Sequence, residues 1–212
     1  MPATEPPVSV ADLAREITDR ADARTGRRLL VGIAGRPGAG KSTLAEALVA
    51  ELGARAVVVA MDGFHLADAV LDALGRRDRK GAPDTFDPRG LAALLQRLRT
   101  EPGPIHAPAF ERTLEQPLAQ AVRIDDQSIV ITEGNYLLVD HPDWERIRAQ
   151  LDLVWWIDGD EQQRITDLTE RHIRFGKSPE QAAAWVARVD QPNAELAAAS
   201  APRADRRLVR PT

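Results

Sequence analysis

Short apolar runs alternate with longer amphipathic stretches along most of the chain. Four runs, at residues 29–35, 54–61, 128–132 and 151–157, are rich in Val, Ile, Leu and Ala. Runs of this length and composition are typical of parallel strands that are buried on both faces. Because helical patterns separate these strands, the chain is predicted to be an α/β protein with a parallel sheet.

Helices are predicted where apolar residues recur at intervals of three and four. Leu91, Leu94, Leu95 and Leu98 form such a stripe, and Pro88 suits the first turn of that helix. The predicted helices cover residues 8–24, 44–52, 67–74, 88–100, 141–150, 160–175 and 179–199.

The middle of the chain departs from this alternation. Residues 75–87 have no hydrophobic period and are predicted to form a loop, whereas 102–112 and 118–124 are predicted to pair as a small antiparallel excursion. A last edge strand is expected at 203–209, and residues 1–7 are expected to be a disordered leader. The sequence contains no internal repeat and no linker, so we expect a single domain over residues 1–212.

The first apolar run leads directly into the sequence GRPGAGKST, which contains G-x-x-x-x-G-K-S. Glycines allow the backbone to point successive N–H groups at phosphate oxygens, and the following helix adds its positive end. Lys41 can reach the β- and γ-phosphates, and the Ser42 hydroxyl can hold Mg²⁺. The alternative is a Gly-rich turn with a surface lysine, but the strand and helix that a phosphate loop requires are both predicted. The candidate nucleotide-binding residues are Gly35, Pro37, Gly38, Ala39, Gly40, Lys41, Ser42 and Thr43.

Two acidic residues follow or end predicted parallel strands. Asp62 comes directly after the run at 54–61, and Glu133 comes directly after the run at 128–132. Ligands of open α/β sheets bind at this edge, so Glu133 could hold a Mg²⁺ shell and Asp62 could accept the proton of an attacking hydroxyl. The alternative is that each acid caps the next turn.

Basic residues gather in two further places. Each group could bind an anionic ligand, or it could simply form a charged surface that is exposed to solvent. Arg164, Arg171, Arg174 and Lys177 lie on or just after one predicted helix, where they could neutralise phosphate charge, although acidic residues interleave with them. The block RRDRK at 76–80 could hold an anion or form a solvated loop.

Composition narrows the classes of function. The chain has 212 residues, 43% of them hydrophobic, a net charge of −4 and no cysteine, which excludes disulfides and thiol catalysis. The charge does not favour a nucleic-acid partner, and the four histidines show no metal-ligand spacing. No apolar run is long enough to span a bilayer and the first residues do not resemble a signal peptide, so we expect no membrane partner and a cytoplasmic location.

Five motifs in order resemble one family. They are GRPGAGKST, MDGFH, KGAPDTFD, IHAPAFER and ITEGNYLL, and together they resemble the P-loop kinase superfamily that contains uridine kinase, phosphoribulokinase and type I pantothenate kinase. The segments 81–87 and 107–108 are most similar to pantothenate kinase, and the resemblance covers the chain after Arg28. Bacterial members similar to this chain are often labelled only as nucleoside/nucleotide kinase-like or as fructose-transport kinases.

The resemblance implies a P-loop NTPase fold with a mostly parallel five-stranded sheet, helices on both faces and a helical lid over residues 160–178. It implies ATP and Mg²⁺ as cofactors and an alcohol as acceptor. Asp62 matches the catalytic aspartate, and Glu133 matches the acid that holds the metal together with Ser42. Arg164 matches a lid arginine at the ATP site, and the lid arginines Arg171 and Arg174 are expected to act in catalysis beside Lys41.

The acceptor is expected to bind to the excursion over residues 75–124 and to its neighbours. Arg112 stands near the position where uridine and pantothenate kinases carry a histidine, and it could bind a carboxylate or phosphate through two parallel hydrogen bonds. The mixture of side chains suits a nucleoside, a sugar or a pantothenate-like acid. The candidate acceptor-binding residues are His65, Arg79, Phe110, Arg112, Tyr136 and Asn193.

The sequence therefore predicts an ATP-dependent kinase that phosphorylates a hydroxyl of a small metabolite. The competing interpretation is a regulatory P-loop ATPase or switch without a small-molecule acceptor. A GTPase would normally carry the guanine-binding sequence N-K-x-D, which is absent here, and the net charge argues against a nucleic-acid-dependent ATPase. A homodimer is left open.

Overall fold

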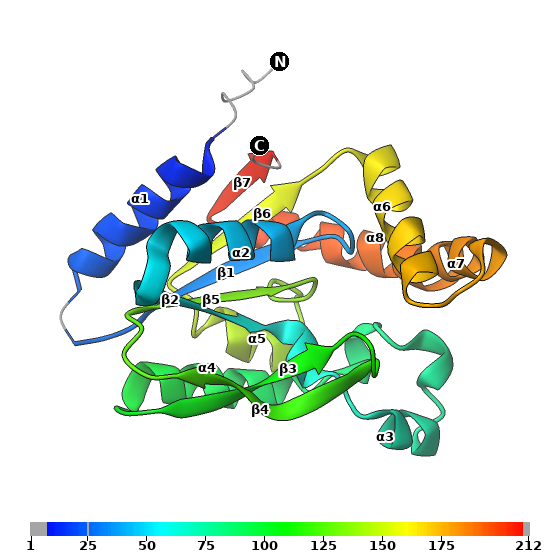
Figure 1. Cartoon of the computed structure of the whole chain (residues 1–212), viewed down its shortest axis with the longest axis horizontal. Coiled ribbons are helices and arrows are strands. Elements are labelled where there is room, and N and C mark those ends of the chain that lie inside the picture. Colours follow the sequence, from blue (N-terminus) through cyan, green and yellow to red (C-terminus); the bar gives the residue numbers. More distant parts are fainter. Residues whose placement is uncertain (1–7, 25, 210–212) are drawn as a thin grey trace.

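The computed structural model describes residues 8–24 and 26–209, and its centre is a sheet of five strands in the order β2-β5-β1-β6-β7 (Figure 1). Every pairing in this sheet is parallel, which confirms the predicted α/β class. The leader predicted for residues 1–7 lies outside the described residues. The strands are β1 (Leu29–Gly35), β2 (Ala56–Ala60), β5 (Ile129–Gly134), β6 (Leu153–Asp158) and β7 (Arg206–Val209).

Helices cover both faces of the sheet, as predicted (Figure 1). Side chains of β1 alternate between the faces because strands have a period of two. Leu29 and Val31 belong to the apolar cluster on the side of α1 and α2, whereas Leu30 belongs to the cluster on the side of α4 and α5. The helices are α1 (Val10–Asp22) and α2 (Lys41–Leu52) on the first face, and α4 (Pro88–Thr100), α5 (Pro142–Arg148) and α8 (Gln191–Ala199) on the second.

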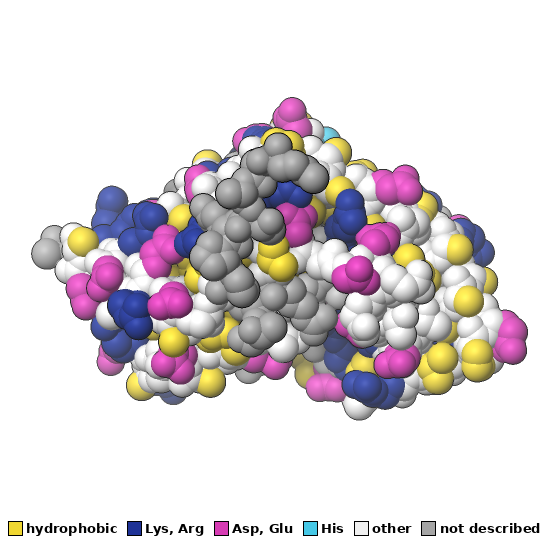
Figure 2. All heavy atoms as spheres, turned by 90° about the horizontal axis from the view of Figure 1, so that it is seen from above, with side chains coloured by type: hydrophobic (Ala, Val, Ile, Leu, Met, Phe, Trp, Pro, Cys, Tyr) yellow, Lys and Arg dark blue, Asp and Glu magenta, His cyan; other side chains and the backbone are white. Residues whose placement is uncertain are grey.

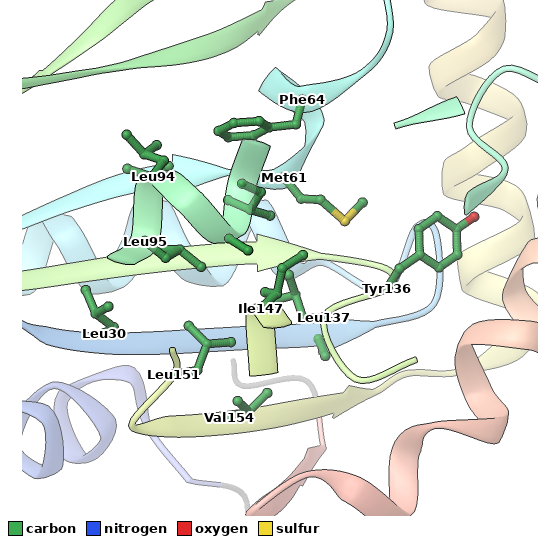
Figure 3. Packing of buried hydrophobic residues seen from close by; sticks show 14 of the residues in the cluster. Leu30, Met61, Phe64, Leu94, Leu95, Tyr136, Leu137, Ile147, Leu151 and Val154 are labelled. Atoms are coloured by element: carbon green, nitrogen blue, oxygen red, sulfur yellow. The ribbon is translucent and has the colours of Figure 1, made fainter. Parts of the chain in front are cut away.

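The second cluster is the larger part of the core. In Figure 3, Leu30 and Val154 of the sheet lie together with Leu94 and Leu95 of α4 and Ile147 of α5. All five side chains have at most 6% of their surface exposed. Because the sheet and the helices α4 and α5 are densely packed in this cluster, the positions of the strand ends that carry the candidate site are fixed.

A short helix, α3 (Asp68–Ala73), precedes the predicted excursion, and the excursion over residues 75–124 contains several tight turns, α4 and a separate hairpin. The hairpin strands β3 (Ile105–Glu111) and β4 (Gln116–Ile124) pair antiparallel, which confirms the predicted pairing. Gly63 allows β3 to approach the turn after β2 closely, since a Cβ on Gly63 would lie 2.5 Å from the Pro108 carbonyl oxygen. The contact brings the hairpin against the turn that contains Asp62.

The chain after β6 is mostly helical. It contains α6 (Glu161–Arg174), which lies within the segment 160–178 predicted as a lid, followed by α7 (Pro179–Trp185), a π-helical turn (Val186–Asp190) and α8. The helix predicted over 179–199 is therefore one continuous helical run, but the π turn within it was not predicted. A π turn inserts one residue into the helical repeat and so changes which side chains share a face.

The surface carries mixed charge. On the face in Figure 2, basic and acidic side chains are interspersed over the described residues, in agreement with the net charge of −4. Within residues 8–24 and 26–209, every helix falls short of the length and apolarity needed to cross a membrane.

Candidate active site

The phosphate loop connects β1 to α2 and requires glycine at two positions. Gly38 has φ +79° and Gly40 has φ +89°, a region that L side chains rarely adopt. A Cβ on Gly38 would also lie 2.7 Å from Leu168 Cγ, because α6 packs directly against the loop. The loop is thus held in a curled conformation by its own glycines and by the lid helix.

Lys41 is buried at the end of this loop. Its Nζ donates to Asn135 Oδ1 at 2.7 Å and to the Arg36 carbonyl oxygen at 3.0 Å. Burial lowers the pKa of Lys41 to about 8, although the nearby Glu133 and Asp62 act in the opposite direction. Asn135 was missed by the sequence analysis, and its signal was a polar residue two positions after Glu133 at the end of a buried strand.

Ser42 and Glu133 bring two side-chain oxygen atoms together beside Lys41, and these are the residues predicted to hold a metal. Ser42 Oγ donates to Glu133 Oε1 at 2.9 Å, and Glu133 has 6% of its surface exposed. Burial raises the pKa of Glu133, with Lys41 opposing. A hydroxyl and a carboxylate at this spacing suit Mg²⁺, which takes one or two protein ligands and completes its octahedron with phosphate oxygens and water. Among the described residues no cluster of three or more His, Cys, Asp or Glu side chains could hold a metal alone.

Asp62 lies in the 3₁₀ turn Met61–Phe64, at the carboxyl end of β2. Arg112 Nη2 donates to Asp62 Oδ2 at 2.9 Å, and His65 Nδ1 lies 2.9 Å from the Asp62 carbonyl oxygen. Burial by itself would raise the pKa of Asp62, but His65, Arg112, Arg171 and Lys41 together outweigh it and hold that pKa below its ordinary value. The side chain is therefore a carboxylate at neutral pH.

One cavity of about 630 Å³ joins the phosphate loop, the excursion and the lid. It brings together eleven of the predicted site residues, so most of the candidate site converges on one place. These are Pro37, Gly38, Lys41, Ser42, Asp62, His65, Phe110, Arg112, Glu133, Arg171 and Asn193.

An adjoining hollow shares Gly38, Lys41 and Ser42 of the phosphate loop with this cavity. It has a volume of about 560 Å³, and Gly40, Thr43 and Arg174 line it, while Arg112 and Arg171 line both spaces. Burial lowers the pKa of Arg171, and the neighbouring Arg112 contributes in the same direction. A group of cationic side chains around these hollows favours the binding of a ligand with several negative charges.

The structure does not bring Arg79 to the cavity. Its guanidinium pairs with Asp84 at 2.9 Å, whereas Arg77 and Lys80 of the same loop line the cavity. The 3₁₀ turn Arg77–Arg79 sends neighbouring side chains in different directions, which the sequence did not reveal. The block at 76–80 is thus divided between the cavity and local ion pairs.

Three other predicted residues have supporting positions. Tyr136 is fully buried and donates to the Gly81 carbonyl oxygen at 2.6 Å, so it holds the excursion loop and does not line the cavity; Figure 3 shows its hydroxyl at the edge of the apolar cluster. Gly35 and Ala39 lie in the phosphate loop but line neither hollow.

Arg164 is buried beneath the phosphate loop and holds it from behind. Its Nη1 donates to the Pro37 carbonyl oxygen at 3.0 Å, and its Nη2 donates to Glu161 at 2.6 Å. The position suits a residue that orients the loop, and Arg164, predicted at the ATP site, lines neither hollow. The Arg164 guanidinium lowers the pKa of Glu161 to about 2.

The helical run after α6 contributes further cavity residues. Trp185 and Asp190, which the sequence analysis missed, line the cavity together with the predicted Asn193. His172 Nε2 lies 2.7 Å from Asp190 Oδ2, which connects α6 to this run. Lys177 Nζ lies 5.0 Å from the centre of the Trp185 ring.

The fold and the site define a P-loop nucleotide-binding protein, and comparisons with known proteins place it more closely. The family described as "Methylmalonyl Co-A mutase-associated GTPase MeaB" matches residues 4–65, a segment that contains the phosphate loop and ends at His65. The chain is 35% identical to the "Uncharacterized protein YggC" of Escherichia coli, over 80% of this chain and 72% of that protein. It is also 35% identical to the "ATP-dependent kinase-like protein notR'" of Aspergillus versicolor, over 58% of this chain and 77% of that protein.

Among solved structures, a "putative fructose transport system kinase" from Silicibacter sp. TM1040 is 34% identical and has a TM-score of 0.86, covering 94% of this chain and 98% of that one. The chain belongs to the P-loop kinase superfamily of uridine kinase, phosphoribulokinase and type I pantothenate kinase. It is a P-loop kinase of the uridine and pantothenate kinase type.

Proposed function

We propose that the protein transfers the γ-phosphoryl group of ATP to a hydroxyl of a small metabolite. The observation that carries this proposal is the single cavity of about 630 Å³ that Lys41, Asp62 and Arg171 line together. It is large enough for a metabolite beside the phosphates of a nucleotide. Relatives named as kinases of uridine and pantothenate support the same reaction class.

At the donor end, the curled loop would bind the phosphates through its N–H groups and through Lys41. Ser42 and Glu133 would hold Mg²⁺, which neutralises phosphate charge when bound. The hydroxyl oxygen of the acceptor forms a bond to the γ-phosphorus while the bond from that phosphorus to the β-phosphate oxygen breaks, and ADP leaves. Asp62 accepts the hydroxyl proton, and Arg171 stabilises the charge that develops on the transferring group.

At the acceptor end, His65, Phe110, Arg112 and Asn193 would surround the reacting hydroxyl. They offer an aromatic wall, polar groups and a cation, which suits a nucleoside, a sugar or a pantothenate-like acid. Tyr136 would act indirectly by holding the Gly81 loop.

A screen of metabolite alcohols tests this function. The purified protein is incubated with ATP, Mg²⁺ and each alcohol, and ADP formation is compared with ³¹P spectra of the products. We expect at least one alcohol to yield ADP and a phosphate ester in equal amounts. If every alcohol left the rate unchanged and all phosphate appeared as inorganic phosphate, the protein would be a P-loop ATPase without a small-molecule acceptor.

Arg171→Met is expected to lower kcat about 10²-fold and to change the KM for ATP only a few-fold, because the charge that Arg171 meets develops in the transition state. Steady-state kinetics with the acceptor from the screen measure both constants. Arg174 is exposed at the edge of the adjoining hollow, so we expect Arg174→Met to have the same sign and a smaller size. Arg15→Met on α1, where 69% of the side chain is exposed, is the matched control. An effect of Arg171→Met on KM alone would contradict the assigned role.

A further inference from the structure

Arg112 lies where the two hollows meet and contacts the proposed catalytic carboxylate directly. Its Nη2 donates to Asp62 Oδ2 at 2.9 Å, and within residues 8–24 and 26–209 this is the only hydrogen bond that its guanidinium makes. Of the Arg112 side chain, 39% is exposed. Because a guanidinium has five N–H donors, most of its hydrogen-bonding capacity is available to a ligand.

Phe110 supports the guanidinium without fixing its direction. The Arg112 guanidinium carbon lies 5.3 Å from the centre of the Phe110 ring. Stacking on an aromatic face allows the N–H groups to turn toward different partners. Lys80 Nζ lies at the same distance from this ring, but it is bonded to Asp68 Oδ1 at 2.7 Å. Arg112 is therefore better placed than Lys80 to change partners.

We propose that Arg112 is an acceptor-sensing residue that restrains Asp62 until an anionic acceptor binds. Without an acceptor, Arg112 holds Asp62 Oδ2. A carboxylate or phosphate group on the acceptor takes the guanidinium through two parallel N–H bonds, and the Asp62 carboxylate is released beside the acceptor hydroxyl. This inference rests on the proposed function, since it gives Arg112 a part in the transfer that Asp62 promotes.

The consequence is protection of ATP from water. In hydrolysis, a water oxygen forms the bond to the γ-phosphorus, the bond to ADP breaks, and the water proton passes to Asp62. A carboxylate that accepts a hydrogen bond from an arginine is a weaker base, so ATP hydrolysis is slow when no acceptor is bound. An anionic acceptor both supplies the hydroxyl and removes the restraint.

The first experiment measures ATP hydrolysis without any acceptor, so it does not require the acceptor to be identified. Arg112→Met keeps a side chain of similar length that can pack against Phe110, and it removes the hydrogen bond and the charge. With ATP and Mg²⁺ alone, we expect its hydrolysis rate to be roughly three- to tenfold above that of the wild type. Arg123→Met in β4 is the matched control, because that arginine pairs locally with Asp125 and has 65% of its side chain exposed; it should hydrolyse ATP at the wild-type rate.

The second experiment supplies the anion without the hydroxyl. Sodium acetate and inorganic phosphate are added separately to the wild-type protein with ATP and Mg²⁺, with sodium chloride at equal ionic strength as the control. We expect one of the two anions to raise hydrolysis in the wild type and not in Arg112→Met. Stimulation by acetate indicates a carboxylate on the acceptor, and stimulation by phosphate indicates a phosphate group.

The pH dependence of ATP hydrolysis tests whether Arg112 acts on Asp62 or has only a structural role. Arg112 lowers the pKa of Asp62, so its removal should move the acidic limb of the hydrolysis profile to higher pH. The other charged groups that face Asp62 are His65, Lys41, Arg171 and Glu133, and they are unchanged in the variant. Combining the variant with Asp62→Asn should abolish the extra hydrolysis.

Two results would overturn the inference. One is hydrolysis by folded Arg112→Met at or below the wild-type rate, with neither anion stimulating the wild type. The other is weaker ATP binding together with slower hydrolysis, which would place Arg112 on the nucleotide phosphates. Both differ from failure of the proposed function, in which the wild type transfers phosphate to no alcohol in the screen.

Discussion

Lys41→Met is expected to lower kcat for phosphoryl transfer on the order of 10³-fold, the largest effect of any single change in this protein. The Nζ group lies at the end of the phosphate loop and donates to Arg36 and Asn135, whereas Lys80 and Lys177, which also line the cavity, come from the excursion and from the segment after α6. The variant removes the charge that, under the proposed function, faces the β- and γ-phosphates. Rapid-quench measurement of ADP formation with saturating acceptor gives the rate.

The stability of the same variant provides the control. Burial lowers the pKa of Lys41 from 10.5 to about 8, so the folded protein disfavours the charged lysine by about 3 kcal/mol at neutral pH. Between these two pKa values the unfolded chain binds more protons, and the wild-type free energy of unfolding should therefore rise with pH from 8 to 10.5. Lys41→Met should be at least as stable as the wild type at pH 7 in urea titrations without nucleotide. Transfer within a few-fold of the wild-type rate would contradict the assignment of the phosphate loop.

Asp62→Asn is expected to lower kcat roughly 10²-fold or more while the affinity for ATP stays nearly unchanged. The amide keeps the shape of the side chain but cannot accept the hydroxyl proton. Because the positive groups around it hold the pKa of Asp62 below its ordinary value, the wild-type carboxylate is ionised throughout the neutral range. The loss should therefore be constant between pH 6 and 8, about a unit on either side of neutrality.

Single-turnover kinetics and titration of ATP binding test this second prediction together. Asp19→Asn on the exposed side of α1 is the matched control, and it should leave both quantities unchanged. If ATP binding collapsed while the single-turnover rate stayed at its wild-type value, Asp62 would be a metal-binding or structural residue and not the base.

The local sequence was sufficient for the framework of this protein. The β-branched runs specify buried parallel strands, and the glycines at 38 and 40 specify the curled loop, because both are properties of a few adjacent residues. The stripe of Leu91, Leu94 and Leu98 specifies α4 for the same reason. The positions of Asp62 and Glu133 also follow, since parallel strand ends share one edge of a sheet.

Contacts between distant residues decided the rest. Arg112 meets Asp62 across fifty positions of sequence, and only the close approach of β3 at Gly63 brings them together. The 3₁₀ turn directs Arg77 and Lys80 into the cavity but Arg79 away from it. The π turn brings Trp185 and Asp190 to the same cavity, although a regular α-helix would place residues five positions apart on different faces. Sequence by itself determined which elements form and where the phosphate loop lies, because these depend on local backbone geometry. Only the tertiary structure decided which side chains line the cavity beside the phosphate loop, because their directions depend on packing between elements that the local pattern does not encode.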